Sequence, residues 1–313
     1  MGINAFYAAT VSPWLRKTEL GERLDMALVA FNANLQFVRF MYAESGSRIF
    51  SEQEIAGIFS DLDSESLAVI NRFMARQYKA PPNGLMVHPK YFYTEAEKAC
   101  YRSLLKDFKS AIRRFRLPRH LVGPESLYYH HGLRQAPEFI KKNVAGKLFG
   151  DVGGWIGDST LAFIGYNPAK TIIFEPDESL RATLEKNLKR NRVPSSKYDI
   201  HPFALSDKRS RFNGFDCCTL DEIRADYPIP FGLLKADIEG MGAAFVRGAR
   251  KTIEQDRPML SLAVYHNEEE FVGIYRMLKA WDLDYKFEFK ALNPFTAYGE
   301  VTLLAYPAEW AES

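Results

Sequence analysis

The hydrophobic and polar positions of the chain follow one spacing before about residue 125 and another after it. In the first part the apolar residues recur at helical spacing, as they do over residues 19–42. The run 80–84, with two prolines and a glycine, predicts a break. We therefore expect residues 1–125 to form a helical N-terminal extension or cap. Two pairs with capping-box spacing mark further helix starts, Ser51 with Glu54 and Thr94 with Glu97.

A long amphipathic helix is predicted over residues 98–119. Its apolar stripe consists of Tyr101, Leu104, Leu105, Phe108, Ile112 and Phe115. Its basic stripe consists of Lys98, Arg102, Lys106, Lys109, Arg113 and Arg116. A solvated helix face explains such a stripe, and so does contact with an anionic partner such as an acidic glycan, a membrane surface or nucleic acid. Because the aromatic residues lie on the opposite stripe, we expect no nucleic-acid partner.

Over residues 126–313, short β-branched or aromatic runs alternate with amphipathic segments. We expect strands over residues 147–151, 171–175, 198–205, 233–237, 259–265, 285–289 and 301–306. Helices are expected over residues 159–166, 178–190, 242–255 and 268–281, with a short one capped by Thr219 and Glu222. This alternation predicts an α/β fold, with a mostly parallel sheet covered by helices on both faces. The last two strands, connected through Asn293-Pro294-Phe295, predict an antiparallel hairpin.

The composition, with 47% hydrophobic and 26% charged residues, is that of an ordinary soluble globular protein. No stretch approaches the roughly 18 apolar residues of a membrane span, and no secretory signal is visible. We therefore expect no transmembrane segment and a cytoplasmic location. None of the three cysteines, Cys100, Cys217 and Cys218, has the spacing of a metal-ligand set. A net charge of +2 indicates little about partners.

A glycine-rich loop follows the first predicted strand and contains the residues from Asp151 to Ser159. Gly153 and Gly157 allow the backbone to approach a ligand closely. The dinucleotide pattern would require a further glycine at position 152, which is Val152. The spacing thus disfavours an NAD-dependent oxidoreductase. The carboxylate of Asp151 would also repel a pyrophosphate but suits a cofactor with a cationic amino-acid tail, which S-adenosylmethionine has.

Glu175 is the last residue of the second predicted strand. A carboxylate at that place and distance from the glycine loop can accept hydrogen bonds from both hydroxyls of a ribose. Capping of the next helix is the competing interpretation, but Asp177 and Glu178 suit that task better. We therefore expect Glu175 to bind the cofactor ribose.

The run from Phe149 to Leu161 resembles the first motif of the FkbM family of methyltransferases. Further motifs follow in the family's order and spacing over residues 126–306: Phe174-Glu175-Pro176, Ala204-Leu205-Ser206-Asp207, Leu220-Asp221-Glu222-Ile223, Leu234-Lys235-Ala236-Asp237-Ile238-Glu239-Gly240, Gly248-Ala249 and Tyr265-His266. The resemblance implies a Rossmann-like class I methyltransferase sheet of seven strands. It also implies methylation of a hydroxyl on a sugar, a glycolipid or a polyketide-like small molecule.

The resemblance implies a role for each motif. Asp151 would receive the amino group of the cofactor, directly or through water. Gly153 and Asp158 would line the methionine side, within a loop that also includes Gly157 and Ser159. Glu175 would take the ribose, and the backbone at Phe203 and Ala204 would meet the adenine. Asp237 and Glu239 would face the methyl group and the acceptor.

Methyl transfer to a hydroxyl requires a group that removes a proton. His266, at the end of the fifth predicted strand, is one candidate base and Glu239 is the other, with Asp237 nearby. A divalent ion held by these three residues is a third arrangement, but hydrogen bonding is commoner and we do not favour a metal. The family often has an acid at the position of Gly242, so a site of three carboxylates is in doubt.

The segment Tyr128-Tyr129-His130-His131-Gly132 precedes the first strand. We expect it to fold across the cofactor, with Tyr129 or His131 closing the pocket. A non-catalytic module that binds S-adenosylmethionine remains an alternative, for which Gly242 is the one supporting feature. The acceptor, expected to be a small molecule or saccharide, is not identified by any motif, and the oligomeric state is open.

Overall fold

The computed structural model describes residues 50–79, 94–293 and 300–312. The helix predicted over 19–42, the break at 80–84 and part of the connection through Pro294 lie outside these residues. Both N-terminal capping boxes are confirmed. Ser51 begins helix α4 (Glu52–Ile58) and Thr94 begins helix α6 (Glu95–Ile112).

A seven-stranded sheet forms the centre of the molecule, as predicted. The strand order is β3-β2-β1-β7-β8-β10-β9, and β9 and β10 are the antiparallel hairpin. The first five strands in this order are mutually parallel, while β10 runs antiparallel to β8. The strands are β1 (Leu148–Val152), β2 (Lys170–Phe174), β3 (Tyr198–His201), β7 (Phe231–Ala236), β8 (Met259–Ala263), β9 (Tyr285–Ala291) and β10 (Val301–Pro307).

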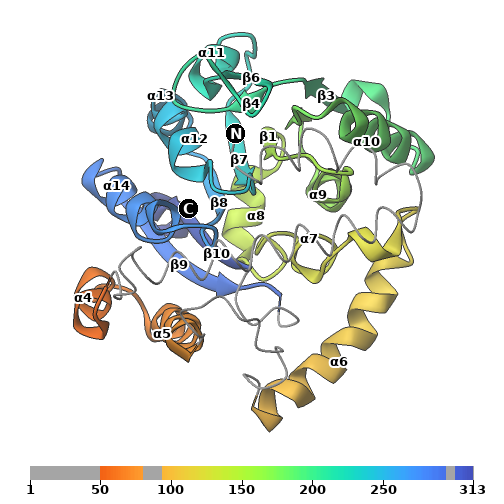
Figure 1. Ribbon diagram of the computed structural model, residues 1–313. Helices are drawn as coiled ribbons and strands as arrows, with labels where there is room; N and C mark the ends of the chain where they lie inside the picture. The colour runs from red at the N-terminus through yellow and green to blue at the C-terminus, as the bar shows by residue number, and fades with distance from the viewer. Residues whose placement is uncertain (1–49, 80–93, 294–299, 313) are drawn as a thin grey trace.

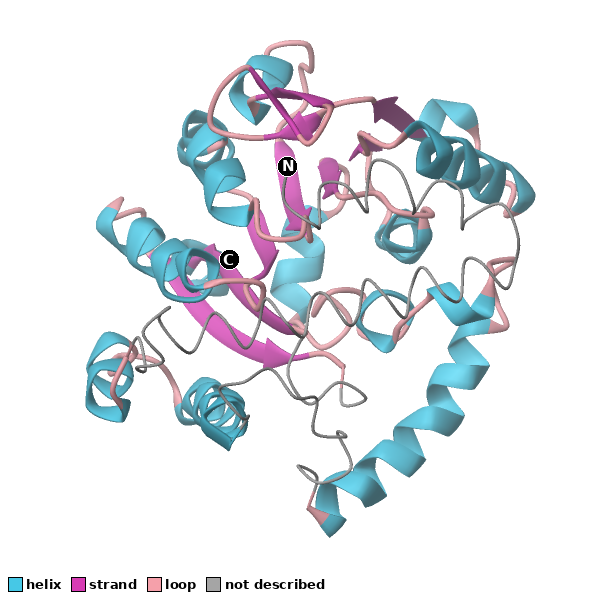
Figure 2. Ribbon diagram, viewed as in Figure 1, coloured by secondary structure: helices cyan, strands magenta, loops and turns pink. Residues whose placement is uncertain are grey.

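Helices cover both faces of the sheet, as Figures 1 and 2 show. On one face lie α8 (Glu138–Val144), α9 (Asp158–Phe163) and α10 (Glu178–Arg190). On the other lie α11 (Leu220–Arg224), α12 (Gly242–Gly248), α13 (Arg250–Asp256) and α14 (Ile274–Ala280). The side-chain period of a strand separates the two cores. In β2, Ile172 and Phe174 join the core beneath α12 to α14, while Ile173 packs beneath α10.

The N-terminal helices pack against the hairpin edge of the sheet. Helix α4 and helix α5 (Ser64–Lys79) add side chains to the core beneath α14. Phe59 is fully buried, with ring centroids 5.7 Å from Phe271 and 5.2 Å from Phe289. The hydroxyl of Ser66 accepts a hydrogen bond from the backbone N–H of Phe289 at 3.0 Å. These contacts attach α4 and α5 to β9 and to the turn before α14.

Helix α6 lies against the opposite side of the sheet domain, beside α7 (Pro124–Leu127). Phe108 and Ile112 of α6 pack with Leu127, Ile156 and Trp155, the last two from the glycine-rich loop. The predicted helix over 98–119 ends early, because after residue 112 the chain turns toward Pro118. The boundary predicted after residue 125 lies within α7.

The third predicted strand divides into two elements. It ends at His201, because Pro202 has no N–H with which to continue the ladder. Strand β4 (Ala204–Leu205) instead joins a second sheet of order β4-β6-β5, with β5 (Ser210–Phe212) and β6 (Phe215–Cys218). The predicted helix 242–255 similarly breaks into α12 and α13 at Ala249.

Substituting Phe59→Ala should remove a large part of the contact between α4 and the sheet. We expect the free energy of unfolding to fall by about 3–5 kcal/mol, because a fully buried ring leaves a cavity among other rings. Urea denaturation measures this change. Phe212→Ala is the control, since its side chain is 46% exposed and should change stability little. Equal losses in the two variants would contradict the packing described for α4.

Candidate active site

The glycine-rich loop connects β1 to α9 at the carboxyl edge of the sheet. Three of its residues have positive φ: Gly153 (+82°), Trp155 (+47°) and Gly157 (+86°). A Cβ on Gly153 would lie 2.2 Å from the carbonyl oxygen of Asp237 at the end of β7. The N–H groups of Gly153 and Gly154 both donate to the carbonyl of Phe174 at the end of β2. The loop is therefore clamped between the ends of β2 and β7, where only glycine fits at position 153.

Asp151 is fully buried and paired within the protein. Its Oδ2 accepts a hydrogen bond from Thr160 at 2.7 Å, and its Oδ1 lies 3.2 Å from Lys235 Nζ without a well-directed hydrogen bond. Lys235 also donates to the carbonyl of Gly153 at 2.7 Å. The pattern of motifs gave no indication that Lys235 or Thr160 would hold Asp151. The contact of Asp151 with a cofactor amino group stays a prediction. The carboxylate that would make this contact already lies next to the buried cation of Lys235.

Glu175 lies directly after β2 and is 5% exposed. Its two oxygens accept hydrogen bonds from the backbone N–H groups of Trp155 and Asp177, each at 3.0 Å. Burial raises the pKa of Glu175 to about 7, although the two N–H donors oppose this rise. Asp177 caps α10 by accepting from Ser179 and Leu180, so the cap does not require Glu175. One carboxylate thus bridges the glycine loop and the start of α10.

Asp158 and Ser159 begin α9, and both are buried. Burial raises the pKa of Asp158, while a hydrogen bond with Ser126 lowers it. The hydroxyl of Ser159 lies 2.7 Å from Nε2 of His131. The carbonyl of His131 accepts a hydrogen bond from Ser261 of β8, also at 2.7 Å. Within the predicted lid segment, His131 is therefore held against the start of α9, and its role in closing the pocket stays a prediction.

Tyr129, Phe203 and Ala204 are the remaining residues expected at the cofactor. Tyr129 is half-buried, and its ring stands edge-on to that of Tyr128 with centroids 4.9 Å apart. Phe203 lies between β3 and β4 and packs partly into the main core. Ala204 pairs with Cys217 in the small sheet. Because β2 and β3 are parallel, the loop after β3 lies at the same edge of the sheet as Glu175. The cofactor roles of Tyr129, Phe203 and Ala204 stay predictions.

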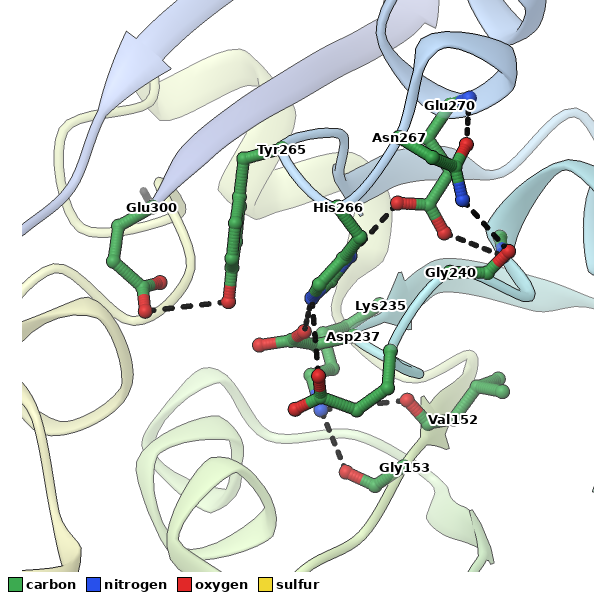
Figure 3. A network of polar contacts seen from close by, with 12 residues as sticks. Val152, Gly153, Lys235, Asp237, Gly240, Tyr265, His266, Asn267, Glu270 and Glu300 are labelled. Carbon is green, nitrogen blue, oxygen red and sulfur yellow. Dashed lines mark hydrogen bonds and ion pairs between the residues drawn. The ribbon is translucent and has the colours of Figure 1, made fainter. Parts of the chain in front are cut away.

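Asp237, Glu239 and His266 come together where β7 and β8 end. Figure 3 shows Asp237 beside His266. Nε2 of His266 lies 3.4 Å from Oδ1 of Asp237 and 3.8 Å from Oε2 of Glu239. The chain turns between the two carboxylates, with φ of +52° at Glu239 and +98° at Gly240. The side chain of His266 is 3% exposed and that of Glu239 is 66% exposed. Nε2 of His266 is buried and has no hydrogen-bond partner.

Glu270 completes this group, and sequence reasoning missed it. It lies in a π-helical turn (Glu269–Gly273) and is fully buried. Its Oε2 lies 2.7 Å from Nδ1 of His266, and its Oε1 accepts the N–H of Gly242 at 2.7 Å. A Cβ on Gly242 would lie 2.7 Å from Oε1 of Glu270. The carboxylate of Glu270 therefore occupies the space that a side chain at position 242 would need.

The three carboxylates around His266 govern its charge. Burial alone would lower its pKa, but the hydrogen bond to Glu270 and the charges of Glu270, Glu239 and Asp237 raise the pKa to about 10. With Nδ1 bound to Glu270, the other nitrogen is directed toward Asp237 and Glu239. A carboxylate that orients a histidine in this way is a common arrangement around a proton-transferring imidazole.

A further polar group lies beside His266. The ring of Tyr265 lies tilted against that of His266 with centroids 4.1 Å apart, and its hydroxyl donates to Glu300 at 3.3 Å (Figure 3). Glu125 of α7 accepts a hydrogen bond from Asn293 at 2.9 Å, and burial together with the charges of Asp158 and Asp237 raises its pKa to about 8. The sequence motifs did not indicate Glu125 or Glu300. Among the described residues, no three metal-ligating side chains are placed to hold a metal ion.

The comparison with known protein families gives a match over the part of the chain that contains this site. The family profile for the methyltransferase FkbM domain matches residues 151–289, from the glycine loop to β9. The chain contains an FkbM methyltransferase domain. Within this FkbM domain lie all the predicted cofactor and catalytic residues except Tyr129. No curated protein matches the sequence.

Solved structures resemble the chain in fold. The crystal structure of methyltransferase FkbM from Methylobacillus flagellatus KT matches with a TM-score of 0.58 at 18% identity, over 81% of this chain. The chain covers 58% of the length of that protein. An rRNA methylase from Streptococcus thermophilus matches with a TM-score of 0.42 at 10% identity, over 60% of this chain and 97% of its own. The likeness to the Methylobacillus structure and the strand order of the sheet show the Rossmann-like class I methyltransferase fold, with helices preceding the FkbM domain.

Among the described residues, no helix combines the length and the hydropathy that crossing a bilayer requires.

Gly153→Ala should destabilise the FkbM domain. The new methyl group would require a positive φ of +82° and would overlap the backbone at Asp237, so we expect unfolding to become easier by about 2–4 kcal/mol. Thermal and urea unfolding measure this effect. Gly165→Ala is the control, because nothing lies within 4 Å of a Cβ there. A Gly153→Ala protein as stable as the parent would show that the loop is not clamped.

Proposed function

We propose that the chain is an S-adenosylmethionine-dependent methyltransferase that acts on a hydroxyl group of a small-molecule or saccharide acceptor. The observation that carries the proposal is the pair formed by His266 and Glu270. It presents an unpartnered imidazole nitrogen beside Asp237, at the edge of the sheet that also holds the glycine loop. The FkbM domain match supports the reaction class.

The charges around the site support a cationic cofactor. Carboxylates converge on this edge from several elements: Asp151, Asp158, Glu175, Asp237 and Glu239. The buried cations among them are Lys235 and His266. S-adenosylmethionine carries a sulfonium and an ammonium group, which such surroundings favour, whereas the diphosphate of NAD would meet repulsion. Gly153 lets the loop pack against the carbonyl of Asp237 at the end of β7, and Glu175, directly after β2, would accept hydrogen bonds from the ribose hydroxyls.

The residues at the end of β7 and β8 would handle the proton. S-adenosylmethionine supplies an electrophilic methyl group on a sulfonium, so the acceptor oxygen forms the new C–O bond as the C–S bond breaks. His266 would take the hydroxyl proton at Nε2, while Glu270 holds Nδ1 and stabilises the resulting imidazolium. Asp237, 3.4 Å from Nε2, would help to orient the acceptor. Glu239 is the competing base, with a far more exposed carboxylate.

The surroundings of Tyr265 support a polyhydroxylated acceptor. Glu125 and Glu300 offer hydrogen-bond acceptors beside the Tyr265 hydroxyl, and both lie near Asp237. An acceptor with a sugar-like set of hydroxyls would satisfy these groups, because carboxyl groups with raised pKa values can both donate and accept hydrogen bonds. Glu125 precedes the FkbM domain, so the N-terminal region would contribute to the acceptor side. A sugar, a glycolipid headgroup or a polyketide-like molecule fits these requirements.

The proposal is tested by binding followed by turnover. S-adenosylmethionine should raise the thermal unfolding midpoint of the protein, and NAD at the same concentration should not, because only a ligand of the native state stabilises it. Incubation with a panel of hydroxylated acceptors should then release S-adenosylhomocysteine, detected by mass spectrometry. Binding without turnover on any acceptor would favour the non-catalytic module. Stabilisation by NAD alone would overturn the proposal.

The affinity for S-adenosylmethionine should depend on the charge of Glu175. Its pKa of about 7 means that the carboxylate form, which accepts from ribose hydroxyls, is lost as the pH falls. Calorimetry should therefore show binding about tenfold weaker at pH 6 than at pH 8. Glu175→Gln should weaken binding and remove this dependence. Glu178→Gln, an exposed neighbour, is the control and should keep the parental pH dependence.

The pH profile of turnover should identify the base. If His266 must lose a proton held with a pKa of about 10, kcat/KM should rise by about tenfold per pH unit from pH 6 to 9. Glu270→Gln removes a charge that raises this pKa, so the rise should move to lower pH by about one to two units. Glu269→Gln is the control, because Glu269 is exposed and pairs with Arg247. This variant should keep the parental pH profile of kcat/KM. A profile that is flat above pH 6 would assign the base to Glu239.

A further inference from the structure

The C-terminal part of α6 and the turn after it form a basic surface that the proposed reaction does not use. This basic segment, residues 102–119, contains one acidic residue, Asp107, and seven basic ones: Arg102, Lys106, Lys109, Arg113, Arg114, Arg116 and Arg119. Its net charge is therefore +6, while the whole chain carries +2, so all other residues together carry −4. The charge of the protein is strongly uneven, with one basic end.

The seven cations of the basic segment are exposed and unpaired. Each has an exposed side chain, and none forms an ion pair with any part of the chain that the structure describes. Several arginines elsewhere are paired, among them Arg224 with Asp256 at 2.5 Å and Arg257 with Glu309 at 2.8 Å. The charge of the basic segment is thus available to an anionic partner.

The apolar side of the basic segment is occupied by the protein itself. Phe108 and Ile112 are each 8% exposed and pack in the cluster that contains Trp155. The backbone N–H of Arg116 donates to Asn191 of the turn after α10 at 2.8 Å. Figure 1 shows α6 along the lower right of the molecule, outside the central sheet. The segment is therefore a fixed platform that presents charge, with no free apolar face for insertion into another phase.

The basic segment has no exposed large hydrophobic or aromatic side chain among its described residues, and this indicates the kind of partner. The exposed large hydrophobic residues among the described positions are Ile164, Phe212 and Ile229, and none is in the basic segment. Single-stranded nucleic acids and sugar chains are commonly held by stacking on exposed aromatic rings. An anionic lipid surface requires only a cluster of about four to eight cations on a helix that can lie on it.

We propose that the basic segment docks the protein on the surface of an anionic lipid bilayer through charge alone. The cations within α6 and at its end, from Arg102 to Arg113, recur along one side over about 16 Å of helix. Such a line can lie parallel to a membrane plane, with the phosphate groups of the lipids as counterions. The glycine loop, which packs beneath the segment through Trp155, would then lie close to that plane. This docking is independent of the proposed methyl transfer.

The test measures co-sedimentation of the full chain with vesicles of phosphatidylcholine, with and without phosphatidylglycerol. We expect binding to the anionic vesicles only, and loss of it at high salt. Each cation near such a surface contributes a factor of about five in affinity, so the triple variant Lys106→Gln, Lys109→Gln, Arg113→Gln should bind about 100-fold more weakly. Its unfolding midpoint and its methyl transfer to a soluble acceptor should match those of the parent.

The control removes the same charge elsewhere. Lys208→Gln, Lys251→Gln and Lys286→Gln together neutralise three exposed lysines outside the basic segment, and vesicle binding should change by about twofold at most. Equal losses in the two triple variants would overturn the proposal, since net charge alone would then explain binding. So would binding to heparin or duplex DNA without binding to anionic vesicles. A protein that binds vesicles but has no transferase activity would contradict the proposed function and would still support the docking proposal.

Discussion

The buried ion pair between Lys235 and Asp151 is the interaction on which the site depends. The two residues lie at paired positions on adjacent central strands, β7 and β1, and both are withdrawn from water. Removing one partner of such a pair typically costs about 3–5 kcal/mol, because the other charge is left buried and uncompensated. Nζ of Lys235 also holds the carbonyl of Gly153, so the pair sets the conformation of the glycine loop. A structural charge pair thereby becomes the support of a ligand-binding loop.

The site is built from the ends of strands, and its electrostatics follow from that origin. Parallel strands bring their carboxyl ends to one edge, where residues distant in the chain become neighbours. Here that edge collects many carboxylates and few cations. Burial raises the pKa values of Glu175 and Glu125, and the neighbouring negative charges add to the rise. The same crowding keeps a proton on His266. The free protein thus stores negative charge that a cationic ligand would relieve.

Sequence patterns predicted the large elements well because each depends on local periodicity. All seven strands of the main sheet were placed within a few residues, and α10 matches its expected bounds. The errors arise where a single residue overrides the pattern, as Pro202 does in ending β3. In the site, the strand-end positions of Asp237 and His266 were predictable. Their tertiary partners were not, because nothing local to Glu270 or Lys235 indicates what each will contact after folding.

The space beside Gly242 is filled by the carboxylate of Glu270, which restricts the residues that these two positions can hold. A side chain at position 242 and the carboxylate of residue 270 exclude each other sterically, since a Cβ there would overlap Oε1. An acid supplied from one position therefore requires a small residue at the other. In this chain a side chain at position 242 would displace the carboxylate that holds Nδ1 of His266. The absence of a side chain at Gly242 thus makes room for a carboxylate that reaches His266 from a different segment of the chain.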